Sequence, residues 1–130
     1  MTDITKDQFW NMLNEPEPVI KSNSDGSKIY MWYNEQGKRH RENDLPAEIW
    51  YDGNNLLISE SWYQNGKRHR INGPTEIWYY DNGIISIVHW HCYGKLHRDN
   101  GPATIMYNRD GSIGSLDDWK NGEFIKRTSL

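Results

Sequence analysis

The feature that most constrains this chain is an internal repeat. The stretch WYQNGKRHRINGPTEIWYY at residues 62–80 has a close copy on each side, WYNEQGKRHRENDLPAEIWY at 32–51 and WHCYGKLHRDNGPATIMY at 90–107. A partial fourth copy, WKNGEFIKR, occupies residues 119–127. One turn glycine recurs at intervals of 29, 28 and 28 residues: Gly37, Gly66, Gly94 and Gly122. Sequence repeats of this length predict stacked copies of one supersecondary unit.

Each unit has the sequence pattern of antiparallel strands joined by tight turns. A second glycine follows Asp or Asn in every unit, as hairpin turns require: Gly26, Gly53, Gly83 and Gly111. We expect strands at residues 28–33, 47–51, 56–63, 75–80, 84–93, 103–107 and 113–119. The expected fold class is all-β, an antiparallel meander of stacked β-hairpins that forms an elongated single-layer sheet over residues 21–130.

Residues 1–20 stand outside the repeat. Apolar side chains at helical spacing predict a short amphipathic helix over residues 6–14, followed by a proline-rich linker. A cap that covers the open end of the array is the favoured role, because repeat arrays need polar ends. The alternative is a detachable helix that binds a partner through Phe9 and Trp10.

The composition is unusual for a domain with a thick core. Only 35% of residues are hydrophobic and the mean hydropathy is −0.96, yet the chain has 7 Trp and 8 Tyr. This balance suits a thin sheet that carries aromatic side chains on its faces. The net charge of −3 does not favour nucleic acid or anionic membrane as a partner. A single cysteine, Cys92, and the lack of a signal peptide or transmembrane segment predict a cytoplasmic protein.

The phrase WYxNGKxHRxxGPAxIxY, followed by a DG or NG turn, resembles the variant MORN (membrane occupation and recognition nexus) repeat. Such repeats occur in bacterial antitoxin-like proteins and in many phage and giant-virus proteins. The match covers most of the chain after residue 27 and departs at residues 43–46 and 123–127. The resemblance implies stacked β-hairpins, and it implies little about chemistry because one fold carries many functions.

Each repeat also carries a basic segment, which in a regular array would stack into a ladder. The members that define this basic ladder are His40, His69, His97, Arg41, Arg70 and Arg98. A functional interpretation is a groove for phosphate, anionic lipid or an acidic protein surface. The favoured interpretation is structural: the His and Arg side chains of each basic segment bond to neighbouring loop carbonyls and pair with Glu48, Glu76 or Asp99, because recurrence in every unit is what stacking demands.

The one cluster of metal-ligand residue types is His89, His91 and Cys92 in the third unit. The two histidines share a face of a strand, so they supply at most half of a closed zinc site. Further ligands would have to come from His69, His97 or Glu60. A structural or partner-facing role is therefore favoured over metal binding, and no cofactor is expected.

No residue set has the pattern of a catalytic site. Cys92 would need an activating pocket, which a single-layer sheet scarcely offers. Asp117 and Asp118 are adjacent in a strand, so their side chains face opposite sides and cannot share a substrate. We expect a protein that is not an enzyme.

These observations favour a non-enzymatic protein-binding module. The resemblance implies an inhibitor that neutralises a toxin or a host-defence nuclease, either antitoxin-like or of the phage anti-CRISPR type. The candidate partner-binding residues are Trp50, Trp62, Trp78, Trp90, His89, His91, Glu60, Asp117 and Asp118. Two alternatives remain: binding of nucleic acid or anionic lipid through the basic ladder, and a structural role as a homodimeric scaffold.

Overall fold

The computed structural model describes residues 5, 6 and 15–130, and every element within residues 15–130, β1 to β13, is a strand. The all-β prediction is confirmed. The helix expected over residues 6–14 lies almost wholly outside the described residues. Nine strands form one antiparallel sheet: β1 (Val19–Ser22), β2 (Lys28–Met31), β3 (Glu48–Tyr51), β4 (Leu57–Ser61), β7 (Glu76–Tyr79), β8 (Ile85–His89), β11 (Thr104–Tyr107), β12 (Ile113–Lys120) and β13 (Glu123–Ser129). Their order in the sheet follows the chain, as in a meander.

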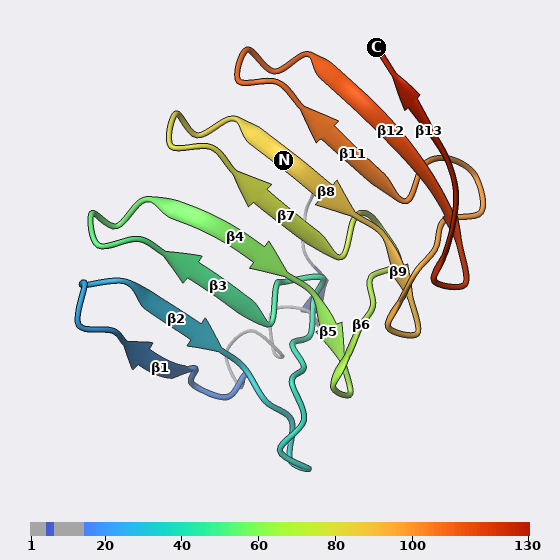
Figure 1. Cartoon of the computed structure of the whole chain (residues 1–130). Coiled ribbons are helices and arrows are strands. Elements are labelled where there is room, and N and C mark those ends of the chain that lie inside the picture. The colour runs from blue at the N-terminus through green and yellow to red at the C-terminus, as the bar shows by residue number, and fades with distance from the viewer. Residues whose placement is uncertain (1–4, 7–14) are drawn as a thin grey trace.

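The strands missing from that series form two small hairpins, β5 (Tyr63–Gln64) with β6 (Lys67–Arg68), and β9 (His91–Cys92) with β10 (Lys95–Leu96). Figure 1 shows these hairpins at one end of the main sheet, whereas the Asp-Gly and Asn-Gly turns lie at the other end. We call the end with the hairpins the loop end. Each repeat thus contributes two strands to the sheet and one hairpin with its following loop to the loop end.

The expected strands 56–63 and 84–93 are each interrupted, at Trp62 and Trp90. At these tryptophans the chain leaves the main sheet and enters the hairpin, so one long strand in the sequence becomes β4 and β5, or β8 and β9. The sequence pattern of alternating side chains continues through the bend, which is why it predicted a single strand.

Two edge strands were not expected. β1 begins in residues expected to form the linker and spans the boundary drawn at residue 20, and β13 covers the departure from the repeat at residues 123–127. Every residue of both strands is exposed. Because edge strands pair on one side only and bury little, their sequences lack the aromatic pattern that marks the inner strands.

The two faces of the sheet differ in chemistry. One row of side chains in direct register crosses a face with mostly polar residues: Met31, Glu48, Ser61, Glu76, His89, Thr104, Asp117 and Arg127. The adjacent row, on the opposite face, is mostly apolar: Tyr30, Ile49, Glu60, Ile77, Val88, Ile105 and Leu116. The buried apolar core is small: Ile29, Trp32, Ala47, Trp62, Val88 and Ala103. Four of these six, Trp32, Ala47, Trp62 and Ala103, lie just outside the strands at the loop end, beside the hairpins and loops.

Candidate functional site

In each repeat, the arginine of the basic ladder lies over the first tryptophan. The guanidinium carbon Cζ is 3.7–3.9 Å from the ring centroid. The pairs are Arg41 with Trp32, Arg70 with Trp62 and Arg98 with Trp90. The same guanidinium donates Nη1 to the carbonyl of the proline that ends the loop, at 3.0–3.2 Å. These contacts close each loop over a core tryptophan by cation–π attraction and hydrogen bonding.

A glycine before the proline makes room for this arginine. A Cβ atom added to Gly73 would lie 2.9 Å from Nη1 of Arg70, and one added to Gly101 would lie 3.0 Å from Nη1 of Arg98. In these two repeats the glycine of the Gly-Pro dipeptide leaves room for the arginine, whereas the first repeat, which has one added residue, makes the same arginine contacts with Leu45 before Pro46.

Two of the three arginines are also neutralised. Arg41 pairs with Glu15 and Arg70 pairs with Asp44, each at 2.9 Å, and the two guanidinium side chains are only 14% and 16% exposed. Arg98 has no carboxylate partner among the described residues. Their burial and pairing support the structural interpretation of the basic ladder, because charges held in this way are poorly placed to attract a phosphate backbone.

The loops and hairpins of successive repeats meet at three junctions. The loop of residues 39–46 lies against hairpin β5–β6, the loop 69–74 against hairpin β9–β10, and the loop 97–102 against the turn from β12 to β13. We call these the first, second and third junctions.

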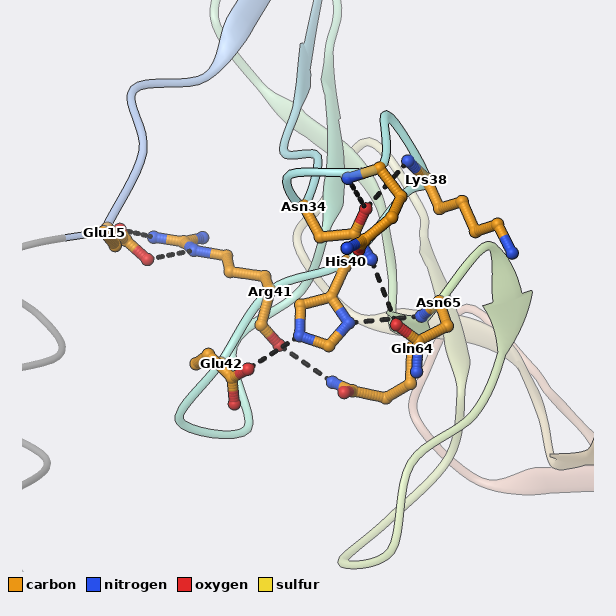
Figure 2. A network of polar contacts seen from close by, with 9 residues as sticks. Glu15, Asn34, Lys38, His40, Arg41, Glu42, Gln64 and Asn65 are labelled. Carbon is orange, nitrogen blue, oxygen red and sulfur yellow. Dashed lines mark hydrogen bonds and ion pairs between the residues drawn. The ribbon is translucent and has the colours of Figure 1, made fainter.

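At the first junction, the histidine of the ladder uses both ring nitrogens (Figure 2). Nδ1 of His40 accepts from the backbone N–H of Asn65 at 3.1 Å, and Nε2 lies 2.7 Å from the carboxylate of Glu42. This arrangement requires the proton on Nε2. The side chain of Gln64 donates to the carbonyl of Arg41 at 2.9 Å. Loop and hairpin are therefore linked by at least two polar contacts.

The third junction repeats these contacts with different side chains. Nδ1 of His97 accepts from the backbone N–H of Asn121 at 3.0 Å, and Nε2 lies 2.8 Å from Asp99. Nζ of Lys120 donates to the carbonyl of Arg98 at 2.6 Å, in the position that Gln64 holds at the first junction. In both junctions the histidine links its loop to the next repeat through Nδ1, and the carboxylate of its own loop binds Nε2.

The second junction departs from this pattern at three positions. His69 has Ile71 where the other repeats have an acid, and Tyr93 replaces the asparagine of the turn. Cys92 replaces the side chain that donates to the loop. His69 makes no side-chain hydrogen bond with another described residue. The centroid of its ring lies 5.9 Å from the centroid of the Tyr93 ring. The hydrogen bond from Gly94 N–H to the preceding loop is 3.4 Å long, against 2.8 Å at the other junctions.

These replacements place apolar surface in water. Ile71 is 87% exposed, more than any other large hydrophobic side chain of the described residues, and Tyr93 is 74% exposed. Both line an open groove of about 720 Å³. Its lining is Lys38, Glu42, Asn43, Asp44, Trp62, Gln64, Asn65, Lys67, His69, Arg70, Ile71, Asn72 and Tyr93. We define the second-junction site as His69, Ile71 and Tyr93.

The candidate tryptophans have structural partners. Trp62 is buried beneath Arg70, and Trp90 is half-buried beneath Arg98. Trp50 and Trp78 are half-buried on the polar face, where their indole N–H groups donate to Glu48 at 2.6 Å and to Glu76 at 2.5 Å. Each of these glutamates also pairs with an arginine, Arg39 at 2.6 Å and Arg68 at 3.3 Å. The third repeat replaces the whole set, with Leu96, Thr104 and Met106.

The two candidate histidines face the same polar surface. Nδ1 of His89 lies 3.0 Å from the hydroxyl of Thr104, and Nδ1 of His91 lies 2.6 Å from the hydroxyl of Thr75. Burial and, as a smaller cause, the charge of Arg68 lower the pKa of both imidazoles, to about 4 for His91. The described residues contain no group of three His, Cys, Asp or Glu side chains that could hold a metal ion.

The three candidate acids each bond to another side chain of the sheet. Glu60 accepts from the hydroxyl of Tyr79 at 2.6 Å on the apolar face. Asp117 is 4% exposed and accepts two hydrogen bonds from Arg127, at 2.7 and 2.8 Å, which lower the pKa of its carboxyl group. Asp118 lies 3.8 Å from Lys126. Asp117 and Asp118 therefore attach edge strand β13 to β12.

Sequence reasoning missed Ile71 and Tyr93, although the sequence contains a signal for them. They are the residues of the second copy and of the following hairpin that break the pattern around the ladder histidine. Neither residue was among the predicted site residues, because isoleucine and tyrosine are common in β-rich sequences.

Comparisons of the chain with protein families, curated proteins and solved structures give no match. The resemblance to variant MORN repeats therefore stays a prediction. In the part of the chain that the structure describes, no helix has the length and apolar character needed to cross a membrane.

Proposed function

We propose that this protein is a non-catalytic protein-binding module and that its partner contacts the second-junction site. The observation that carries the proposal is the exposure of Ile71 and Tyr93 at the one junction where the repeat pattern is broken. Apolar and aromatic side chains beside a groove are the anchors that dominate protein interfaces.

Stability gives no reason for these residues. In the other repeats the equivalent acid bonds to the ladder histidine of its own loop, and the equivalent asparagine donates its backbone N–H to the histidine of the preceding repeat. Ile71 leaves His69 without that acid, and Tyr93 holds a φ of 49° that asparagine tolerates better, so both residues weaken the fold. Residues that weaken a fold in this way are typical of functional sites.

The resemblance to antitoxin-like and phage repeats implies a particular form of this function. In that form, the protein inhibits a toxin or a host-defence nuclease by occupying a surface that the target needs. The alternative, nucleic-acid or anionic-lipid binding through the basic ladder, is less favoured because Arg41 and Arg70 are paired with carboxylates and lie over tryptophans.

The class of partner is tested by affinity capture of the full chain from a bacterial lysate, with and without nuclease treatment. We expect a protein retained in stoichiometric amount after nucleic acid has been digested. Capture that disappears with nuclease treatment, and that weakens steeply with salt, would replace the proposal with the nucleic-acid alternative.

A further inference from the structure

We infer that the second-junction site binds a carboxylate side chain of the partner, which occupies the position beside His69 that Glu42 and Asp99 occupy beside the other ladder histidines. This inference rests on the proposed function and specifies what the partner must present: an Asp or Glu flanked by an apolar or aromatic residue.

The chain itself supplies the precedent. Nε2 of His40 lies 2.7 Å from a carboxylate oxygen of Glu42, and Nε2 of His97 lies 2.8 Å from a carboxylate oxygen of Asp99. In both cases the acid is two residues after the histidine. In the second repeat that position is Ile71, whose side chain is exposed and cannot accept a hydrogen bond. The imidazole remains, and its acid is missing.

The charges around the groove favour an acid. Lys38 and Lys67 are exposed and line it. Asp44 on the lining is neutralised by Arg70, whereas Glu42 binds the neutral His40 and keeps its charge. Two ammonium groups against this one carboxylate leave the lining with a net positive charge, so an incoming carboxylate meets a complementary surface, which guides both encounter and register.

The apolar members of the site define what must flank the acid. The ring centroid of Tyr93 lies 5.9 Å from that of His69, and Ile71 follows His69 by two residues in the loop. A partner side chain packed on these two residues would exclude water from the carboxylate and so strengthen its bond to His69. The open groove of about 720 Å³ can accept several residues, which favours a peptide segment over a small acid.

The test begins with a library of random linear peptides displayed on phage and selected against the full chain. We expect the enriched peptides to share an Asp or Glu next to an apolar or aromatic residue. The best peptide is then synthesised with its acid and with the matching amide, Gln or Asn, and both are measured by calorimetry. The amide peptide should bind about tenfold to a hundredfold more weakly, as expected for the loss of a charged hydrogen bond.

Variants of the protein locate the effect. In His69→Asn, the preference for the acid over the amide peptide should largely disappear, which a merely structural histidine would not cause. Ile71→Glu should block the site with its own carboxylate, and Ile71→Gln, of nearly equal size, is the matched control that should weaken binding less.

The two proposals fail in different ways. If the enriched peptides bind equally well as acid and amide, but lose binding in Tyr93→Asn, the carboxylate inference is wrong and the protein-binding surface stands. If no peptide is enriched, or if binding is unchanged in both Ile71→Glu and Tyr93→Asn, both proposals are wrong.

Discussion

Arg70 lies over Trp62 with its guanidinium carbon 3.9 Å from the ring centroid, and its Nη1 donates to the carbonyl of Pro74 at 3.0 Å. The tryptophan is 6% exposed, so the guanidinium forms part of the lid over the core. The recurring arginine is therefore a packing residue, and its mutation should lower the stability of the fold.

Arg98 gives the cleanest test of this role, because it has the tryptophan and the proline carbonyl without a carboxylate partner among the described residues. Arg98→Ala should lower the free energy of unfolding by about 1–3 kcal/mol through loss of the stack and the hydrogen bond. Urea unfolding measures this change. The control is Lys67→Ala, an exposed change that should stay within about 0.5 kcal/mol. Equal stability of the two variants would contradict the packing role.

The Glu76 set should behave as a unit. Glu76→Thr alone leaves the indole N–H of Trp78 without its acceptor and the guanidinium of Arg68 without its ion-pair partner, which should cost about 1–3 kcal/mol. The triple change Arg68→Leu, Glu76→Thr and Trp78→Met installs the residues of the third repeat and should recover most of that loss. Denaturant unfolding of the single and the triple variant compares their free energies of unfolding. A triple variant less stable than Glu76→Thr would show that the sets are not interchangeable.

Tyr93→Asn should separate stability from binding. Tyr93 has φ of 49°, in the left-handed region that asparagine tolerates better than tyrosine, and Asn65 and Asn121 hold the equivalent turns at 52° and 51°. The variant should be more stable by about 0.5–1 kcal/mol, yet bind its partner more weakly. Thermal unfolding and a binding isotherm on the same preparation measure both effects. A less stable variant, or one that binds fully, would contradict this assignment.

His91 predicts a pH dependence of stability. Burial lowers its folded-state pKa to about 4 from the ordinary 6.5, so between these values the unfolded chain binds the proton and the folded chain does not. Its contribution to stability is fully present above about pH 6.5 and is lost as the pH falls to about 4, on the order of 2 kcal/mol because solvent screens this half-buried ring. Urea unfolding across this range should show a shallower acid decline for His91→Asn than for the parent. Parallel curves would contradict the assignment.

The sequence predicted the meander well because the inner strands alternate side chains between turns that need glycine. The interruptions at Trp62 and Trp90 could not be read from it, since a strand that bends out of its sheet keeps the same alternation. The edge strands β1 and β13 escaped for the opposite reason: they are fully exposed and carry little pattern. The sequence also favoured a structural role for the basic ladder, but it did not predict that its arginines lie over tryptophans and bond to proline carbonyls, because these contacts form only in the folded loops.

The binding site was harder to predict, because its signal is a difference between copies. Four candidates, the tryptophans, were conspicuous by size and proved to be buried or half-buried. Ile71 and Tyr93 stand out only in comparison with the equivalent residues of the other repeats, which bond to His40 and His97. In a repeat protein, the contacts of the regular copies identify the residues that stability does not explain.

In the proposed function, the partner binds at the second junction. The most direct test compares the parent chain with the double variant Ile71→Glu and Tyr93→Asn for affinity toward the protein captured from lysate, with stability measured in parallel. We predict a variant at least as stable as the parent that binds about a hundredfold or more weakly, since interface anchors contribute about 2 kcal/mol or more each. A stable variant that retains full affinity would contradict the account.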